Sequence, residues 1–167
     1  IPSYNRKDRL KNAIDSVLAQ DEKDFELIVV DDGSDDGTSD LAEEYSDRII
    51  YIYQKNSGVS AARNRGIASS NSPYITLLDS DDTWNYNKLR SDREFIGNNP
   101  GIMIHQTEDI WIRNGRRVNP GLKHLKPEGN IFIQSLRLCL ISPSSVCINR
   151  KIFEEYGMFD EKLPVCE

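Results

Sequence analysis

Residues 25–33 read F-E-L-I-V-V-D-D-G, and this stretch decides the fold. An apolar run that is interrupted only by Glu26 is typical of a strand covered on both faces, as in the sheets of α/β proteins. Asp31-Asp32-Gly33 then ends the run abruptly. The stretch therefore predicts a buried strand inside an α/β fold, with carboxylates at its carboxyl end.

Strand-like and helix-like segments alternate on either side of this stretch. We expect further strands at residues 1–2, 49–53 and 74–78, and helices at residues 10–18, 41–45, 60–68 and 87–98, with Asp8 capping the first helix. Alternation of this kind is typical of a mainly parallel sheet with helices on both faces.

The pattern changes after Gly101. Residues 102–112 favour an extended chain, Asn114-Gly115 is a hairpin signal, and Val118 closes an antiparallel pair. We expect a short helix at residues 131–138, a strand at 145–148, and a helix at 151–156 that Gly157 caps. The sheet is therefore expected to be mixed.

Composition narrows the function classes. The 167 residues are 38% hydrophobic and 29% charged, which is typical of one globular domain, and no apolar run is long enough to span a membrane. A net charge of -6 argues against a nucleic-acid partner. Three irregularly spaced cysteines, Cys139, Cys147 and Cys166, favour a reducing compartment. We expect a cytoplasmic protein, or one held peripherally at the inner face of the membrane. We also expect the chain to be truncated at both ends.

Two acidic turns are the candidate chemical site. Asp31-Asp32 and Asp79-Ser80-Asp81-Asp82 both follow buried strands, so folding should bring several carboxylates to one edge of the sheet. Clustered carboxylates repel one another unless a cation compensates, and oxygen ligands without His or Cys point to Mg²⁺ or Mn²⁺. The competing interpretation is that these aspartates only form turns and helix caps.

Two other binding classes fit part of the pattern. Asp32, Ser34, Asp36, Gly37 and Glu43 have the spacing of a calcium-binding EF-hand loop, but the strand before them replaces the helix that such a loop requires. A phospho-receiver-like, Mg²⁺-binding signalling module would explain Asp31-Asp32. It would leave the second acidic turn and the long second half of the chain unexplained.

Taken in order, seven motifs resemble glycosyltransferase family 2. They are I-P-S-Y-N-R, S-V-L-A-Q, E-L-I-V-V-D-D-G-S-D-D-G-T, N-S-G-V-S-A-A-R-N-R-G, Y-I-T-L-L-D-S-D-D, S-S-V-C-I-N-R and G-M-F-D-E-K-L-P-V-C-E, and they span the chain. The resemblance implies a GT-A-like, Rossmann-like, three-layer α/β/α fold with a mixed, mainly parallel sheet. It also implies an inverting mechanism, a nucleoside-diphosphate-sugar donor, and one domain over residues 1–167. Residues 1–100 would bind the nucleotide sugar, and residues 101–167 would begin the acceptor-side half.

The resemblance also assigns roles in nucleotide binding. Pro2, Ser3 and Tyr4 match the segment that contacts the nucleotide, and Asp32 matches the carboxylate that accepts a hydrogen bond from the base. A carboxylate only accepts hydrogen bonds, so it selects the N–H donor of uracil over a ring nitrogen that is itself an acceptor. Residues 58–63 match the segment that approaches the base and phosphates, where Gly58 permits close approach and Arg63 supplies charge. A surface role on a helix explains Arg63 nearly as well.

The turn at residues 79–82 resembles the D-x-D element of the family. The resemblance implies that Asp79 and Asp81 contact the nucleotide sugar, with Asp81 on the ribose, and that Asp82 binds the Mg²⁺ or Mn²⁺ that bridges the phosphates. Asp81 is also a candidate metal ligand. Such an ion shares its shell between one or two carboxylates, phosphates and water, so no cage made wholly of protein ligands is expected.

The general base is the weakest part of the assignment. The family base is the aspartate of a Glu-Asp pair, and Glu167 matches the first member of that pair, which puts the base one residue further on. His105 and His124 are isolated histidines that no motif supports.

The sequence therefore predicts an inverting glycosyltransferase that uses a UDP-sugar and a hydroxyl acceptor in the synthesis of cell-surface polysaccharide or glycolipid. A polysaccharide, a lipid-linked oligosaccharide and a protein all remain candidate acceptors. A sugar nucleotidyltransferase and the signalling module are the alternatives. The donor sugar and the oligomeric state do not follow from the sequence.

Overall fold

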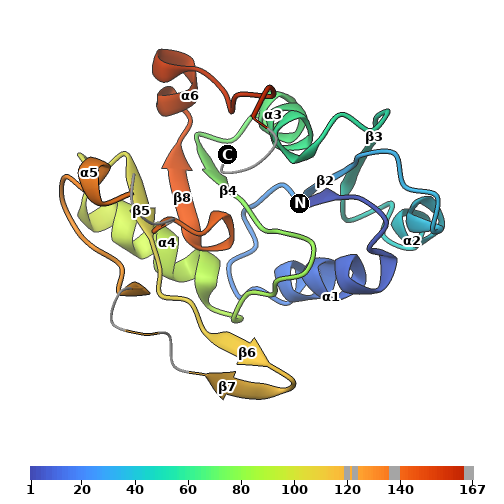
Figure 1. Cartoon of the computed structure of the whole chain (residues 1–167), viewed down its shortest axis with the longest axis horizontal. Helices are drawn as coiled ribbons and strands as arrows, with labels where there is room; N and C mark the ends of the chain where they lie inside the picture. Colours follow the sequence, from blue (N-terminus) through green and yellow to red (C-terminus); the bar gives the residue numbers. More distant parts are fainter. Residues whose placement is uncertain (119–120, 122–123, 136–139, 164–167) are drawn as a thin grey trace.

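A computed structural model describes residues 1–118, 121, 124–135 and 140–163 of the chain. Strands and helices alternate through the first hundred residues, as expected (Figure 1). The elements are β1 (Pro2–Ser3), α1 (Lys7–Leu18), β2 (Ile28–Asp31), α2 (Thr38–Glu43), β3 (Ile50–Tyr53), α3 (Val59–Ser69), β4 (Tyr74–Thr76), α4 (Lys88–Asn98), β5 (Ile104–Gln106), β6 (Trp111–Arg113), β7 (Arg116–Val118), α5 (Phe132–Ser135), the short helix η2 (Pro143–Ser145), β8 (Val146–Asn149) and α6 (Lys151–Tyr156).

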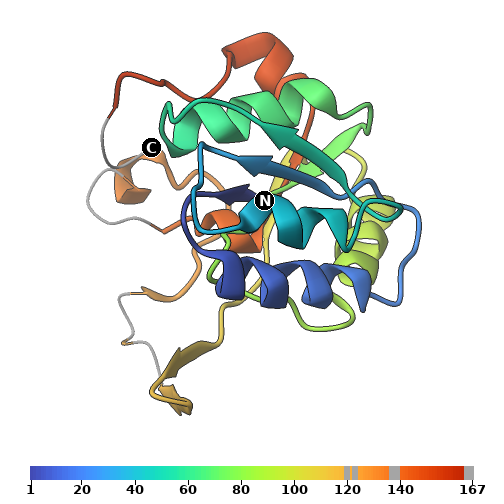
Figure 2. The same ribbon diagram turned by 90° about the vertical axis from the view of Figure 1, so that its right-hand side faces the viewer.

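The strand β2 lies at the centre of a parallel sheet with the order β1-β2-β3. All four of its residues are buried, and its side chains alternate between two cores. Val29 packs with apolar residues of α1 and α2, whereas Ile28 and Val30 pack with Ala62 of α3. Helices therefore cover both faces of this sheet (Figure 2), which confirms the expected α/β fold and explains the uninterrupted apolar run.

The strands β4, β8 and β5 form a second, antiparallel sheet in which β8 is central. A separate core joins this sheet to α3 through Ile67 and to α6 through Phe153. The expected mixture of parallel and antiparallel pairing is present, but it is divided between two sheets rather than contained in one.

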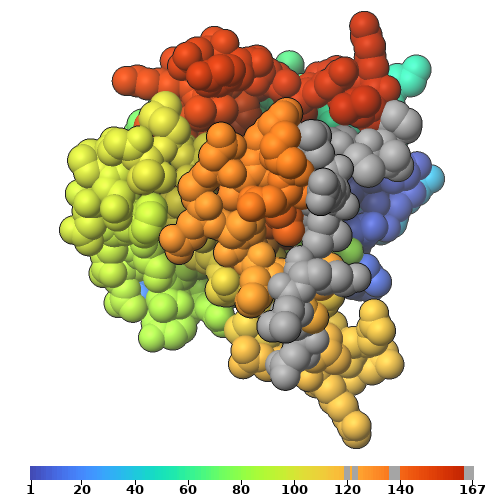
Figure 3. Space-filling model, turned by 60° about the vertical axis from the view of Figure 1, so that its left-hand side comes forward, coloured from blue at the N-terminus to red at the C-terminus, as the bar shows by residue number. Residues whose placement is uncertain are grey.

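The Asn114-Gly115 hairpin is confirmed. The strands β6 and β7 pair from Trp111 with Val118 to Arg113 with Arg116, and both turn residues have positive φ, as a two-residue hairpin turn needs. The hairpin projects from the body of the molecule, at the lower end of the face that α4 and α5 form (Figure 3).

Some predicted boundaries were wrong. Asp8 lies in the first turn of α1 and does not cap it. The carboxylate of Asp36 accepts the Lys7 N–H at 2.8 Å instead, from a distant loop. β2 begins at Ile28 rather than Phe25, and α2 begins at Thr38 rather than Leu41. The helix expected at residues 131–138 is observed at Phe132–Ser135, and residues 136–138 lie outside the described residues. None of the described helices is long and apolar enough to cross a membrane.

Arg150 joins the end of β8 to the segment between α3 and β4. Its guanidinium donates to the carbonyl oxygens of Ser72 at 2.8 Å, Ile67 at 3.2 Å and Ser70 at 2.7 Å. An arginine presents its donors on three separate nitrogens in a planar fork, whereas the donors of a lysine all radiate from one nitrogen and cannot match the same three positions.

We therefore expect Arg150→Met to lower the free energy of unfolding by at least about 2 kcal/mol, because three hydrogen bonds from a charged donor are lost. Arg150→Lys should fall between this variant and the parent protein. Urea unfolding measures the change, and Lys151→Met is the control for loss of an exposed neighbouring charge. Equal stability of the two methionine variants would contradict the role given to Arg150.

Candidate functional site

The helix α3 connects the two acidic segments that the sequence singled out. The N–H of Gly58, the residue before its first turn, donates to Asp32 at 2.8 Å. Within the helix, Arg63 pairs with Asp79 at 2.9 Å. The start of α3 therefore contacts both acidic segments. Gly58 holds the carboxyl end of β2, and Arg63 holds the turn that follows β4.

Asp31 has a structural role. Its carboxylate is buried and accepts the hydroxyl of Tyr51 at 2.6 Å and the N–H of Ser34 at 2.9 Å. Burial, and then the hydrogen bond to Asp31, raise the pKa of Tyr51 well above its usual range. The tyrosine therefore stays protonated and keeps donating, and Asp31 fixes β3 and the start of the following loop.

Asp32 organises the loop between β3 and α3. Its carboxylate accepts hydrogen bonds from the Gln54 side chain at 2.7 Å and from the N–H groups of Ser57 and Gly58, both at 2.8 Å. Two carboxylate oxygens offer about four acceptor positions. Three of them are used here, which leaves room for one further donor at the end of β2.

The side chains of the 79–82 turn have different partners. The N–H of Asp82 donates to the Asp79 carbonyl at 3.0 Å and closes the turn. Asp79 pairs with the buried Arg63. Asp81 pairs with Arg6 at 2.9 Å and Arg9 at 3.2 Å, and both arginines are largely exposed.

Asp82 lies near three other carboxylates. Removal of part of its surface from water, and then the negative charges of Asp79, Asp81 and Asp109, raise its pKa, while the Ser144 hydroxyl that donates to its Oδ2 at 2.6 Å works in the opposite direction. A carboxylate whose ionised form is disfavoured in this way gains from a bound cation. The oxygen donors present fit Mg²⁺ or Mn²⁺. Asp82 fits the metal better than Asp81, whose charge two arginines already balance.

The N-terminal residues assigned to the nucleotide differ in exposure. Ser3 lies in β1 with a buried hydroxyl that has no hydrogen-bond partner, and its neighbour Pro2 pairs with Val30. Tyr4 is 50% exposed and free to stack on a planar ligand. Gly58 has a φ of +93° and open space around it, as close approach by a ligand requires.

Sequence reasoning missed Arg6, Arg9 and Ser144. Arg6 belongs to one of the seven motifs, but nothing in that motif indicates that Arg6 pairs with Asp81. Ser144 is separated from Asp82 by 62 residues and reaches it only because η2 and β8 fold back beside β4.

The EF-hand interpretation is excluded. A strand precedes the loop, Asp32 is occupied by residues 54–58, and Asp36 accepts from Lys7 and Thr38. Of the two histidines, His105 is buried against Asp92, and His124 makes a tilted ring contact with Trp111. Glu167 lies outside the described residues.

A pocket of about 260 Å³ lies between the segment at Asp109 and the segment that leads into η2. Trp111, His124, Lys126 and Asp109 are among its lining residues, and Lys126 pairs with Asp109 at 2.7 Å. Asp109 also contributes to the raised pKa of Asp82, which links this pocket electrostatically to the candidate metal position.

Comparison with known sequences identifies relatives of the chain. A family model described as glycosyl transferase family 2 matches residues 1–157. An uncharacterized glycosyltransferase of Rickettsia bellii is 35% identical over 98% of this chain and 25% of its own length. TuaG of Bacillus subtilis, a putative teichuronic acid biosynthesis glycosyltransferase, is 31% identical over 90% of this chain and 60% of its own length. The chain thus spans only part of these relatives.

Comparison with solved structures gives the same fold. S. aureus TarS 1-349 in complex with UDP matches with a TM-score of 0.78 at 24% identity, over 97% of this chain and 49% of that one. The mannosyltransferase PcManGT from Pyrobaculum calidifontis, in complex with GDP-Man and Mn²⁺, matches with a TM-score of 0.71 at 16% identity, over 97% of this chain and 46% of that one.

The environment of Asp82 predicts a pH-dependent stability. The pKa of Asp82 in the folded protein lies above the ordinary value of 3.8. The protonated carboxyl therefore favours the folded state, and this contribution to stability is lost as the pH rises from 3.8 through the raised pKa. We expect Asp82→Asn to raise the melting temperature of the metal-free protein at pH 7. The gain should vanish at about pH 3, where the carboxyl is protonated in both the folded and the unfolded chain.

Asp81→Asn is the matched control, because it removes a charge that Arg6 and Arg9 stabilise. It should give no gain at pH 7. Melting curves of both variants in the presence of a chelator test which carboxylate is destabilised by its surroundings. A larger rise in melting temperature for Asp81→Asn than for Asp82→Asn would contradict the choice of Asp82.

Gly33 supports the loop that Asp32 holds. It has a φ of +86°, and a Cβ there would lie 2.8 Å from the backbone nitrogen of Asn56. We expect Gly33→Ala to cost about 1–3 kcal/mol of stability from this strain and contact. Gly101→Ala, in open space without a positive φ, should cost much less in the same urea titration. Similar losses of stability in the two variants would show that the loop relaxes around an added Cβ, so that Gly33 is not required there.

Proposed function

The chain belongs to glycosyl transferase family 2, and we propose that this glycosyltransferase moves a sugar with inversion from a uridine-diphosphate sugar to a hydroxyl acceptor. The proposal depends mainly on one observation: α3 holds a buried acceptor carboxylate, Asp32, and a crowded acidic turn in one site. A nucleoside diphosphate has matching chemistry, since its base donates a hydrogen bond and its phosphates need a cation beside carboxylates.

Asp32 would read the base. Its remaining acceptor position would take the N–H of uracil, and the exposed ring of Tyr4 would stack on the base. UDP is bound by TarS and GDP-Man by PcManGT. The shared fold thus accommodates both bases, and selection of uracil would depend on side chains such as Asp32.

The 79–82 turn would bind the diphosphate. Asp82, with Asp81 as a second candidate, would hold Mg²⁺ or Mn²⁺, which as a Lewis acid stabilises the leaving diphosphate. Asp79 stays fixed by Arg63. Arg6 and Arg9 are exposed at the site and would exchange Asp81 for phosphate oxygens, which would free Asp81 for the ribose or the metal.

The acceptor side includes the general base and the region that would bind the acceptor. We assign the general base to the residue after Glu167, as the family resemblance implies. The pocket at Trp111 and Asp109 offers an aromatic face and a carboxylate to a sugar. The name of TuaG supports a cell-surface polysaccharide as the class of acceptor.

The proposal predicts metal-dependent nucleotide binding. UDP should stabilise the protein against heat only when Mn²⁺ or Mg²⁺ is present, because the metal screens the repulsion between diphosphate and aspartates. At ~100 times the Kd the gain should be about 2.7 kcal/mol. Differential scanning calorimetry with and without a chelator measures it, and a gain that the chelator leaves unchanged would refute the metal site.

Two variants separate the roles within this site. Asp82→Asn should abolish the metal-dependent gain. The control Asp47→Asn removes an equal charge at an aspartate that is 83% exposed and pairs with Arg48, and it should have no effect. Asp32→Ala should lower the ratio of UDP to CDP affinity, because cytosine presents a ring nitrogen acceptor where uracil presents an N–H donor. The ratio is the readout because Asp32 also holds residues 54–58. An unchanged ratio would remove the base-reading role.

A further inference from the structure

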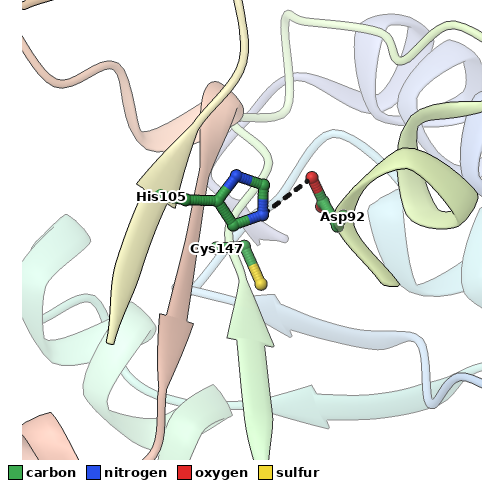
Figure 4. Close-up of side chains that lie close together, drawn as sticks. All are labelled: Asp92, His105 and Cys147. Carbon is green, nitrogen blue, oxygen red and sulfur yellow. Dashed lines mark ion pairs between the residues drawn. The ribbon is translucent and has the colours of Figure 1, made fainter. Parts of the chain in front are cut away.

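A second group of potential metal ligands lies in the antiparallel half of the molecule. Asp92 of α4, His105 of β5 and Cys147 of β8 lie close together (Figure 4). Their ligand atoms all lie within 4.8 Å of one another. The side chains of His105 and Asp92 are only 9% and 4% exposed, and Cys147 is equally buried.

The sheet register creates this group. His105 and Cys147 are directly opposite each other in the β5–β8 pair, so their side chains stand on the same face. The helix α4 lies over that face and supplies Asp92. Phe95, one turn further along α4, stacks on the imidazole with ring centroids 4.6 Å apart and fixes the plane of the ring.

Two polar atoms in this group are buried without a hydrogen bond. Asp92 Oδ1 and His105 Nε2 lie 3.3 Å apart, yet neither has a hydrogen-bond partner. Buried polar atoms are nearly always satisfied, and an unsatisfied one costs about 1–3 kcal/mol. A cation between the two atoms would satisfy both.

The local charges set a condition on that cation. Lys88 binds Asp92 Oδ2 at 2.5 Å and so leaves Oδ1 available. The ammonium of Lys88 would repel a divalent ion, so a second negative charge is needed. Burial raises the pKa of Cys147 to about 12, which keeps its thiol neutral in the metal-free protein. A bound metal ion deprotonates a coordinating thiol and thereby gains that charge.

We propose that Asp92 Oδ1, His105 Nε2 and Cys147 Sγ bind one Zn²⁺ ion, with a water molecule as the fourth ligand. Binding would release the thiol proton to solvent and form the zinc–sulfur bond. A cavity of about 450 Å³, lined in part by Asp92 and Cys147, offers room for the water. Nitrogen and sulfur ligands favour Zn²⁺ over Mg²⁺ and Mn²⁺, so this site and the acidic turn would select different metals.

Such an ion would cross-link two elements of the fold. It would tie α4, which begins six residues after the acidic turn ends at Asp82, to the central strand of the antiparallel sheet. The proposal does not depend on the proposed transfer reaction, and its test needs no sugar donor.

Co²⁺ is the spectroscopic probe for this site. In a Cys139→Ser, Cys166→Ser protein, Cys147 is the one remaining thiol. With excess Mg²⁺ present to occupy oxygen sites, Co²⁺ should produce thiolate-to-cobalt charge-transfer absorption that saturates at about one ion per chain and releases a proton. Adding Cys147→Ser should abolish the band. His105→Gln should weaken Co²⁺ binding by at least about 10-fold.

Zn²⁺ provides the second measurement. It should raise the melting temperature of the parent protein and of Asp82→Asn alike, but not of Cys147→Ser. A protein with Cys147 as its one thiol that shows no charge-transfer band at saturating Co²⁺ would overturn the proposal. A Zn²⁺ shift retained in Cys147→Ser would do the same, and Asp92 and His105 would then form an ordinary buried ion pair.

Discussion

Burial of two adjacent carboxylates at the end of β2 is the constraint on which the site depends. Ionised carboxylates withdrawn from water cost several kcal/mol unless donors surround them. Asp31 and Asp32 meet this demand with hydrogen bonds from β3, from the loop after β2 and from the segment before α3. Asp31 thus fixes β3 and the loop after β2, whereas Asp32 holds the loop before α3 and would also recognise the base. Removing the Asp32 charge would therefore alter both the fold and the proposed binding.

Local patterns explain how much of this arrangement the sequence could predict. The buried strand, the Asn114-Gly115 hairpin and the acidic turn each depend on neighbouring residues, and the structure contains all three. Features that join distant segments left no local signal. Asp36 rather than Asp8 serves the start of α1, and Ser144 reaches Asp82 from 62 residues away. The division of the strands into two sheets is equally a matter of long-range packing.

The acidic turn distributes its charges among different partners. A buried arginine fixes Asp79, two exposed arginines balance Asp81, and a single hydroxyl serves Asp82. Partial burial, and then the neighbouring negative charges, raise the pKa of Asp82 against the hydrogen bond from Ser144. The ionised carboxylate of Asp82 is therefore disfavoured in the free protein, and a bound cation would stabilise it.

The three carbonyl contacts of Arg150 bear on the order in which the chain folds during synthesis. They join residues 78 to 83 positions apart, and β8, which they anchor, is the central strand between β4 and β5. The parallel sheet needs only the first 53 residues for its strands and can form as the chain leaves the ribosome. β4 must wait for β8, with Ile75 and Leu77 uncovered in the meantime. The antiparallel half is thus the later stage of folding, during which apolar surface and an unpaired strand edge stay exposed.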